Sequence, residues 1–151
     1  MSLRILSLRT LLRPLVLAAA LVAAPFTVAA AQSQSEVNDA LRANSAIYNG
    51  LFTAAVIHHV ADTCETLQGP NRASRVAYFL GLYRQARALG YSRAQIEDFV
   101  NDKAEQELMR TLVHQHLERQ GVAPTDAAAV CAFGLQEIEK RSSIGRRLSE
   151  R

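Results

Sequence analysis

The stretch from Tyr78 to Val100 most constrains the fold, because it contains a complete helix, stop and helix signal. Gly90 can adopt the left-handed backbone conformation that ends a helix with little strain. Ser92 then provides an N-cap, and Gln95 three positions later completes a capping-box pattern. The segment therefore predicts two helices that meet at a corner. Helical spacing predicts one apolar face on the first of them: Phe79, Leu80, Tyr83 and Ala86.

Residues 1–31 have the pattern of a secretory signal peptide. Three arginines precede an apolar run over Leu15–Val28, and three alanines before Gln32 give a small-residue cleavage site. The run is shorter than the roughly 20 apolar residues that a bilayer-spanning helix needs. We therefore expect cleavage and a periplasmic location, and the alternative is that the segment is kept as a membrane anchor.

Removal of this segment changes the charge balance. It carries three of the 17 Lys and Arg residues and none of the 14 Asp and Glu residues, so residues 32–151 are formally neutral. A neutral chain gives no support for a nucleic-acid partner, and we expect no stable membrane insertion after cleavage. The remaining length suits one domain with a hydrophobic core.

Helical periodicity and stop signals divide the rest of the chain. Residues 32–48 are polar with scattered apolar positions and are interpreted as a loose lead-in or frayed helix, followed by a single helical domain over residues 49–151. Five helices are predicted in that domain: Gly50–Leu67, Arg72–Leu89, Arg93–Asn101, Asp102–Gln120 and Ala127–Arg141. The third and fourth could be continuous through a bend. Short connections and the lack of strand-like alternation predict an all-α, compact orthogonal bundle.

The two cysteines, Cys64 and Cys131, predict one disulfide. Two cysteines in an exported chain are expected to pair with each other. The bridge would join the first predicted helix to the last. A redox-active pair is the alternative, but reactive pairs usually have close spacing such as Cys-x-x-Cys, so a structural bridge is favoured.

His58 and Asp62 raise a metal or ligand hypothesis. They lie four positions apart on one helical face, and His114 could join them if the Gly50–Leu67 and Asp102–Gln120 helices pack together. The His-Glu-x-x-His spacing of known zinc enzymes is absent, and isolated pairs of this kind arise by chance. No metal ligand, catalytic residue or cofactor-binding residue is therefore predicted.

Two further groups have alternative interpretations. Glu105 and Glu107 lie near Arg110 and are interpreted as a solvated helix face. A binding surface could be formed by tyrosines beside arginines of the corner: Tyr78, Tyr83, Tyr91, Arg84 and Arg87. The alternative for the tyrosines is packing at the corner with their hydroxyl groups in water.

Several short motifs occur in a characteristic order: Asn49-Gly50-Leu51 before Cys64, Leu89–Val100, Val130-Cys131-Ala132 and Ser143-Ile144-Gly145. In their order and spacing, the chain resembles a small uncharacterised family of exported helical proteins from alphaproteobacteria, classified as a domain of unknown function. The resemblance covers about residues 49–148. It implies an all-helical fold with two paired cysteines and supplies no catalytic residues.

These observations favour a periplasmic, non-enzymatic helical interaction or accessory module. Its expected partner is another periplasmic or membrane-complex protein, and no cofactor is predicted. No GxSxG, P-loop, Gly-rich dinucleotide turn or catalytic Cys–His motif is present in the sequence. Two alternatives remain: a small periplasmic enzyme or ligand or metal binder that uses the His58/Asp62 region, and an acid-stress chaperone that exposes apolar surface at low pH.

Overall fold

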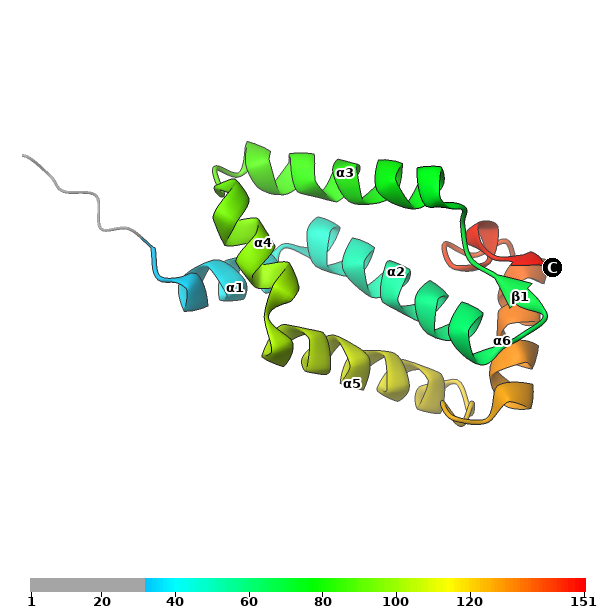
Figure 1. Cartoon of the computed structure of the whole chain (residues 1–151). Helices are drawn as coiled ribbons and strands as arrows, with labels where there is room; N and C mark the ends of the chain where they lie inside the picture. Colours follow the sequence, from blue (N-terminus) through cyan, green and yellow to red (C-terminus); the bar gives the residue numbers. More distant parts are fainter. Residues whose placement is uncertain (1–31) are drawn as a thin grey trace, which may run out of the picture. The chain divides into compact units, whose positions relative to one another are not determined.

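A computed structural model describes residues 32–151 of the chain (Figure 1). These residues form six α-helices: α1 (Gln34–Ala43), α2 (Ser45–Thr63), α3 (Arg72–Ala88), α4 (Arg93–Asn101), α5 (Lys103–Arg119) and α6 (Ala127–Glu139). A 3-10 helix η1 (Gly145–Arg147) and two short strands, β1 (Leu67–Gln68) and β2 (Ser149–Glu150), complete them. The predicted signal peptide over residues 1–31 lies outside the described residues. Within residues 32–151, none of the helices combines the length and hydropathy that a transmembrane span requires.

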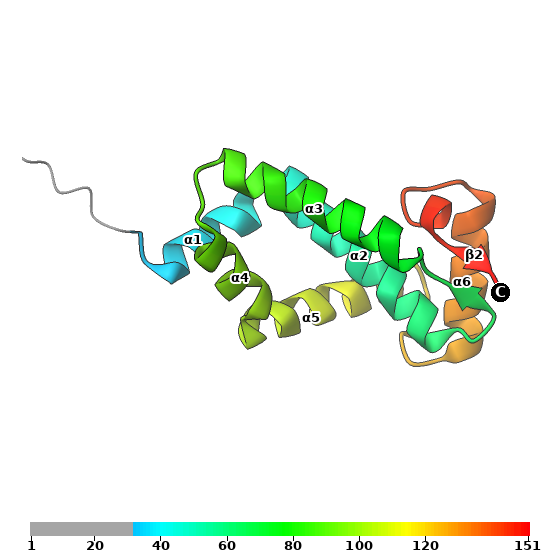
Figure 2. The ribbon, with the colours of Figure 1, turned by 45° about the horizontal axis from the view of Figure 1, so that its top comes forward.

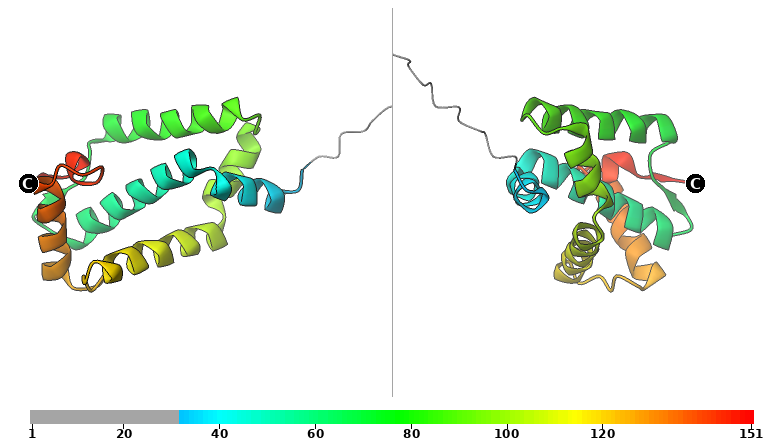
Figure 3. Two further views of the ribbon diagram at one scale, coloured as in Figure 1. Left: turned by 180° about the vertical axis from the view of Figure 1, so that it is seen from behind. Right: turned by 60° about the vertical axis from the view of Figure 1, so that its left-hand side comes forward.

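Helix α2 lies in the middle of the helical unit. Helices α3 and α5 run along two sides of it, and α6 crosses the end of α2 that leads into β1 (Figures 1 and 2). Helices α1 and α4 pack together near the opposite end, as the views in Figure 3 also show. The predicted all-α bundle is therefore confirmed. The small sheet, in which β1 pairs antiparallel with β2, was not predicted.

The core consists of two clusters of buried apolar side chains. The larger joins α2, α5 and α6, and its helical members are Val56, Ile57, Val60, Val113, Leu117, Val130 and Phe133. The smaller joins α1, α4, the start of α2 and the end of α3. It contains Val37, Leu41, Ile47, Ala86, Ile96 and Phe99. Since α2 contributes to both clusters, it connects the two halves of the core.

Helix α1 corrects the expectation of a loose lead-in or frayed helix over residues 32–48. Ser33 forms a capping box, in which its hydroxyl accepts from the Glu36 amide at 3.3 Å and the Glu36 carboxylate accepts from the Ser33 amide at 2.8 Å. Val37 and Leu41 then bury fully in the smaller cluster. A single pair of buried apolar residues gives a weak periodic signal, which is why the polar composition was misleading.

The corner between α3 and α4 agrees with its prediction. Gly90 has a φ angle of 96°, the left-handed conformation that favours glycine. The Ser92 hydroxyl accepts from the Gln95 amide at 3.2 Å, and the Gln95 side chain accepts from the Ser92 amide at 2.8 Å. Both signals depend only on neighbouring residues, and α4 has the predicted bounds.

The predicted disulfide between Cys64 and Cys131 is present, with a Cα–Cα distance of 5.1 Å. It joins the end of α2 to the second turn of α6. Helix α2 ends at Thr63 and not at Leu67 as predicted, because the chain after Cys64 turns into β1. The Arg151 amide also donates to the Thr66 carbonyl at 2.9 Å, so the C-terminal end is attached beside the disulfide.

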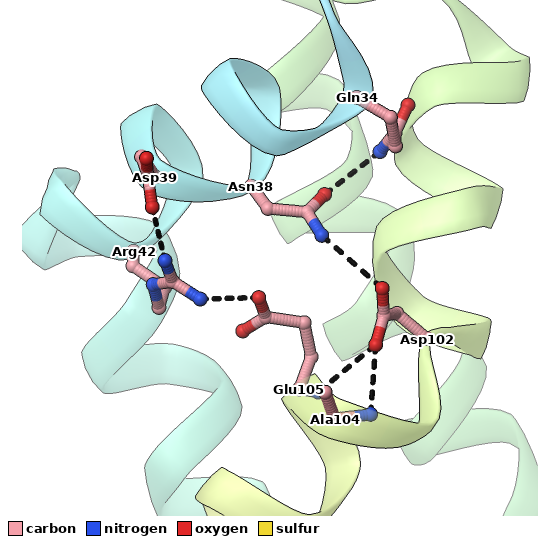
Figure 4. A network of polar contacts seen from close by, with 7 residues as sticks. All are labelled: Gln34, Asn38, Asp39, Arg42, Asp102, Ala104 and Glu105. Atoms are coloured by element: carbon pink, nitrogen blue, oxygen red, sulfur yellow. Dashed lines mark hydrogen bonds and ion pairs between the residues drawn. The ribbon is translucent and has the colours of Figure 1, made fainter.

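Asp102 separates α4 from α5 and resolves the question of a continuous bent helix. Its ψ angle of 121° is extended, and its carboxylate accepts from the Ala104 amide at 2.7 Å and from the Glu105 amide at 3.2 Å. The same carboxylate accepts from the Asn38 side chain at 3.4 Å (Figure 4). The helix break is therefore tied to α1 by side-chain hydrogen bonds.

Glu105 corrects a second expectation, since it does not lie on a solvated face. It is buried and forms an ion pair with Arg42 of α1, which also pairs with Asp39 (Figure 4). The Arg42 side chain reaches Glu105 from a position 63 residues earlier in the chain, so the sequence around Glu105 carries no local signal of this contact. Glu107 and Arg110 form the exposed pair that the sequence predicted.

Candidate functional site

Helix α3 is attached to the rest of the fold mainly through its second half. Leu82 and Ala86 are buried, and the Tyr78 hydroxyl donates to the Gly50 carbonyl of α2 at 2.9 Å. A Cβ at Gly50 would approach the Leu82 side chain to 2.6 Å, so the missing side chain lets the two helices come together. The first half of α3, residues 72–77, is exposed throughout.

The outward side of α3 carries large apolar side chains in contact with solvent. Val76 is 59% exposed, Phe79 46% and Leu80 41%. The sequence predicted one apolar face through Phe79, Leu80, Tyr83 and Ala86; of these, Ala86 is buried and Tyr83 packs against the smaller core cluster, whereas Phe79 and Leu80 are exposed. Helical periodicity alone fits an inward side turned toward Phe79 and Leu80 as well as one turned toward Leu82, and Ala86 lies close to both. The close approach at Gly50 selects the second.

These side chains form one continuous surface, which we call the α3 face. It is a shallow depression of about 560 Å³ lined by Arg72, Arg75, Val76, Phe79, Leu80 and Tyr83. Contiguous exposed apolar side chains on a soluble domain mark interaction surfaces more often than isolated ones do. The α3 face is therefore the strongest candidate for a functional surface in residues 32–151.

All charged side chains of α3 are positive. The helix carries Arg72, Arg75, Arg84 and Arg87 and no acidic residue. Within the described part of the chain, no carboxylate forms an ion pair with any of these four arginines, although Arg42, Arg93 and Arg110 each have acidic partners. Arg147 adds a further cation beside α3, because its guanidinium lies 4.3 Å from the ring centroid of Tyr78.

The three tyrosines for which the sequence left open a binding surface or corner packing have mixed positions. Tyr78, Tyr83 and Tyr91 are half-buried, and the latter two pack against the smaller core cluster. Arg87 donates to the Tyr91 carbonyl at 2.7 Å. Packing at the corner therefore buries much of the surface of these three side chains. Of the three, Tyr83 alone lines the α3 face.

The structure brings His58 and Asp62 together but does not place His114 with them as a ligand set. His58 Nδ1 lies 3.0 Å from an Asp62 carboxylate oxygen, and the two side chains are 72% and 71% exposed. His114 instead lies against His59, with ring centroids 5.2 Å apart. Across residues 32–151, no group of three His, Cys, Asp or Glu side chains is arranged to hold a metal ion.

A groove of about 630 Å³ between α2 and α5, lined also by Phe79 of α3 and the end of α4, contains His58 and Asp62 near one end and Tyr48 and Glu105 near the other. One Glu105 carboxylate oxygen and the Tyr48 hydroxyl are buried without a hydrogen-bond partner. Burial, with a smaller contribution from the Glu105 charge, raises the pKa of Tyr48. A phenol with a raised pKa is a poor proton donor near neutral pH. The other Glu105 oxygen is bound by Arg42, so this end of the groove offers no assembled acid–base pair.

Comparison with known proteins gives a family without an assigned activity. A protein-family model described as "Family of unknown function (DUF5333)" matches residues 39–149. No curated protein and no solved structure matches the chain. The function must therefore be inferred from the geometry of the chain itself.

Proposed function

The chain belongs to this family of unknown function, and from that premise we propose that it is an exported, non-enzymatic accessory protein that binds a partner protein through the α3 face. The observation that carries the proposal is the exposure of Val76, Phe79 and Leu80 side by side on one helix. The partner surface it fits is apolar with carboxylates at its edge, because α3 carries arginines alone among charged residues.

The small contribution of α3 to the core supports a docking role for this helix. The larger core cluster contains no α3 residue, and the disulfide, β1 and the C-terminal end stabilise that cluster independently of α3. A change on the outward side of α3 therefore leaves most of the core intact. The residues on this side of α3 can therefore be adapted to a partner protein without loss of the fold.

Export is the second part of the proposal. The N-terminal signal pattern and the disulfide between distant cysteines support it, since disulfides form and persist mainly outside the reducing cytosol. The partner would then be a periplasmic protein or the periplasmic part of a membrane complex.

The export proposal predicts that protein isolated from its own cells begins near Gln32 and is soluble in the periplasmic fraction. The measurement is intact mass of the native protein. A mass that still includes residues 1–31, found in the membrane fraction, would contradict cleavage and release.

The docking proposal predicts that Phe79→Ala weakens partner binding at least about fivefold, because truncation of an apolar anchor at an interface costs more than about 1 kcal/mol. The partner is the protein that co-purifies with the native chain, identified by mass spectrometry and then reconstituted with purified protein for calorimetry. Leu135→Ala is the matched control, since Leu135 is 43% exposed on α6. It should change the Kd less than about twofold. Equal effects of the two variants would contradict docking through α3.

A further inference from the structure

We infer that the partner element bound by the α3 face is an amphipathic α-helix with carboxylates near both of its ends, lying along α3. This inference rests on the proposed docking role and specifies the chemistry and shape of the partner. It is carried by the positions of the apolar and basic residues along one line of α3.

The exposed Val76, Phe79 and Leu80, with the half-buried Tyr83, follow the spacing of a helix–helix contact. Val76, Phe79, Leu80 and Tyr83 occupy positions i, i+3, i+4 and i+7, which lie on one side of a helix. Anchors at this spacing are typical of recognition in which one amphipathic helix lies against another surface. The line of contact is narrow and straight, so a single helix fits it better than a broad sheet surface does.

Arginines stand at both ends of this line. Arg72 is four positions before Val76, and Arg87 is four positions after Tyr83, so both continue the same helical side. At 1.5 Å rise per residue, their Cα atoms are about 22 Å apart along the axis. Both side chains are exposed, and no acidic residue in 32–151 pairs with either. A partner helix of about four turns with a carboxylate near each end would satisfy both arginines.

A second copy of the chain fits this surface poorly. In an antiparallel pair of α3 helices Arg72 would face Arg87 of the other copy, and in a parallel pair each arginine would face its own equivalent. Like charges placed opposite each other at an interface are destabilising. The charge pattern therefore favours a partner with acidic residues over self-association.

An anionic membrane surface is also a poorer fit. Helices that lie in the membrane interface have one broad apolar face and carry their basic residues on the other. On α3 the exposed apolar line is not such a broad face, because Leu82 and Ala86, which lie next to it on the helix, are buried in the protein. The arginines at the ends also lie on the apolar line itself.

Reciprocal charge exchange with synthetic helical peptides tests the inference. One 16-residue peptide carries leucines at i, i+4, i+7 and i+11 with glutamates at both ends, and a second differs only in having lysines at the ends. The protein is the full disulfide-bonded chain over residues 32–151, as wild type and as Arg72→Glu with Arg87→Glu. Binding is followed by NMR shifts of the α3 amides. Arg119→Glu in α5 is the control for a general charge effect.

The wild type should bind the glutamate peptide at least about fivefold more tightly than the lysine peptide, and the double variant should reverse this order. Shift changes should map to residues 72–87. If the wild type bound both peptides equally while the shift changes still mapped to α3, the inference of an acidic helix would be overturned. Docking through α3 would still stand. No shifts on α3 with either peptide, together with an unchanged partner Kd for Phe79→Ala, would overturn both. Arginine-dependent binding to phosphatidylglycerol vesicles without peptide binding, or dimerisation through α3, would also overturn the inference.

Discussion

Replacing both Cys64 and Cys131 with alanine is expected to lower the free energy of unfolding by about 2–4 kcal/mol while the helical content is retained. The disulfide closes a loop between residues 67 positions apart, and a cross-link over a loop of that length reduces the entropy of the unfolded chain by a free-energy equivalent of about 4 kcal/mol, with measured values often lower. The helices remain because their apolar faces are unchanged. Denaturant titrations followed by circular dichroism measure both quantities.

The reduced wild-type protein provides the control for this variant. It should lose about the same stability, since it lacks the same cross-link but keeps both sulfur atoms. A denaturant titration of the double-alanine variant with the same midpoint and slope as wild type would contradict a structural role for the bridge. Two titratable thiols in native protein under denaturing conditions would contradict the pairing itself.

Gly145→Ala is expected to destabilise the fold by about 3 kcal/mol, the upper end of the usual cost of overpacking. A Cβ at Gly145 would overlap the Glu137 carbonyl and come against the Ile138 amide of α6, so backbone and not a flexible side chain would have to move. The C-terminal turn carries Ile144 and Leu148 into the larger core cluster, and displacement of this turn would weaken their packing. Thermal and denaturant unfolding measure the loss.

Gly81→Ala is the matched control for this substitution. Gly81 lies inside α3, and a Cβ there would meet no atom within 4 Å. Alanine in a helix interior is more favourable than glycine by about 0.5–1 kcal/mol, so this variant should be slightly more stable than wild type. A Gly145→Ala protein as stable as wild type would show that the turn does not pack on α6 as closely as described.

The parts of the fold that were predictable from the sequence are those set by neighbouring residues. The α3–α4 corner follows from Gly90, Ser92 and Gln95, whose effects are complete within six positions. The disulfide followed from the number of cysteines and the expectation of export. The all-α class followed from periodicity and short connections.

The parts that were not predictable depend on contacts between distant segments. Glu105 is buried where Arg42 of the distant helix α1 pairs with it, and the sequence near Glu105 resembles that of an exposed helix. The exposure of Phe79 follows from the missing side chain at Gly50, 29 positions earlier. The candidate surface was therefore only partly predictable: Arg84, Arg87 and the tyrosines drew attention to α3, but Phe79 and Leu80 were placed on the same apolar face as the buried Ala86.

The positions of the histidines show the same limitation. Helices α2 and α5 do pack together, as the metal hypothesis required. The rotation of each helix about its own axis then decides which histidine meets which, and it places His114 beside His59 and leaves His58 with Asp62 in solvent. Helical spacing alone does not determine that rotation when several faces carry polar residues.

The most direct measurement of the central claim is site-specific photo-crosslinking in the native cells. A photoreactive phenylalanine analogue replaces Phe79 in one variant and Leu135 in the other, and the adducts are identified by mass spectrometry. We expect one identified periplasmic or membrane-complex protein to crosslink from position 79 through an acidic helical segment and not to crosslink from position 135. Crosslinking of that protein from position 135 with none from position 79 would contradict the assignment of α3 as the docking surface.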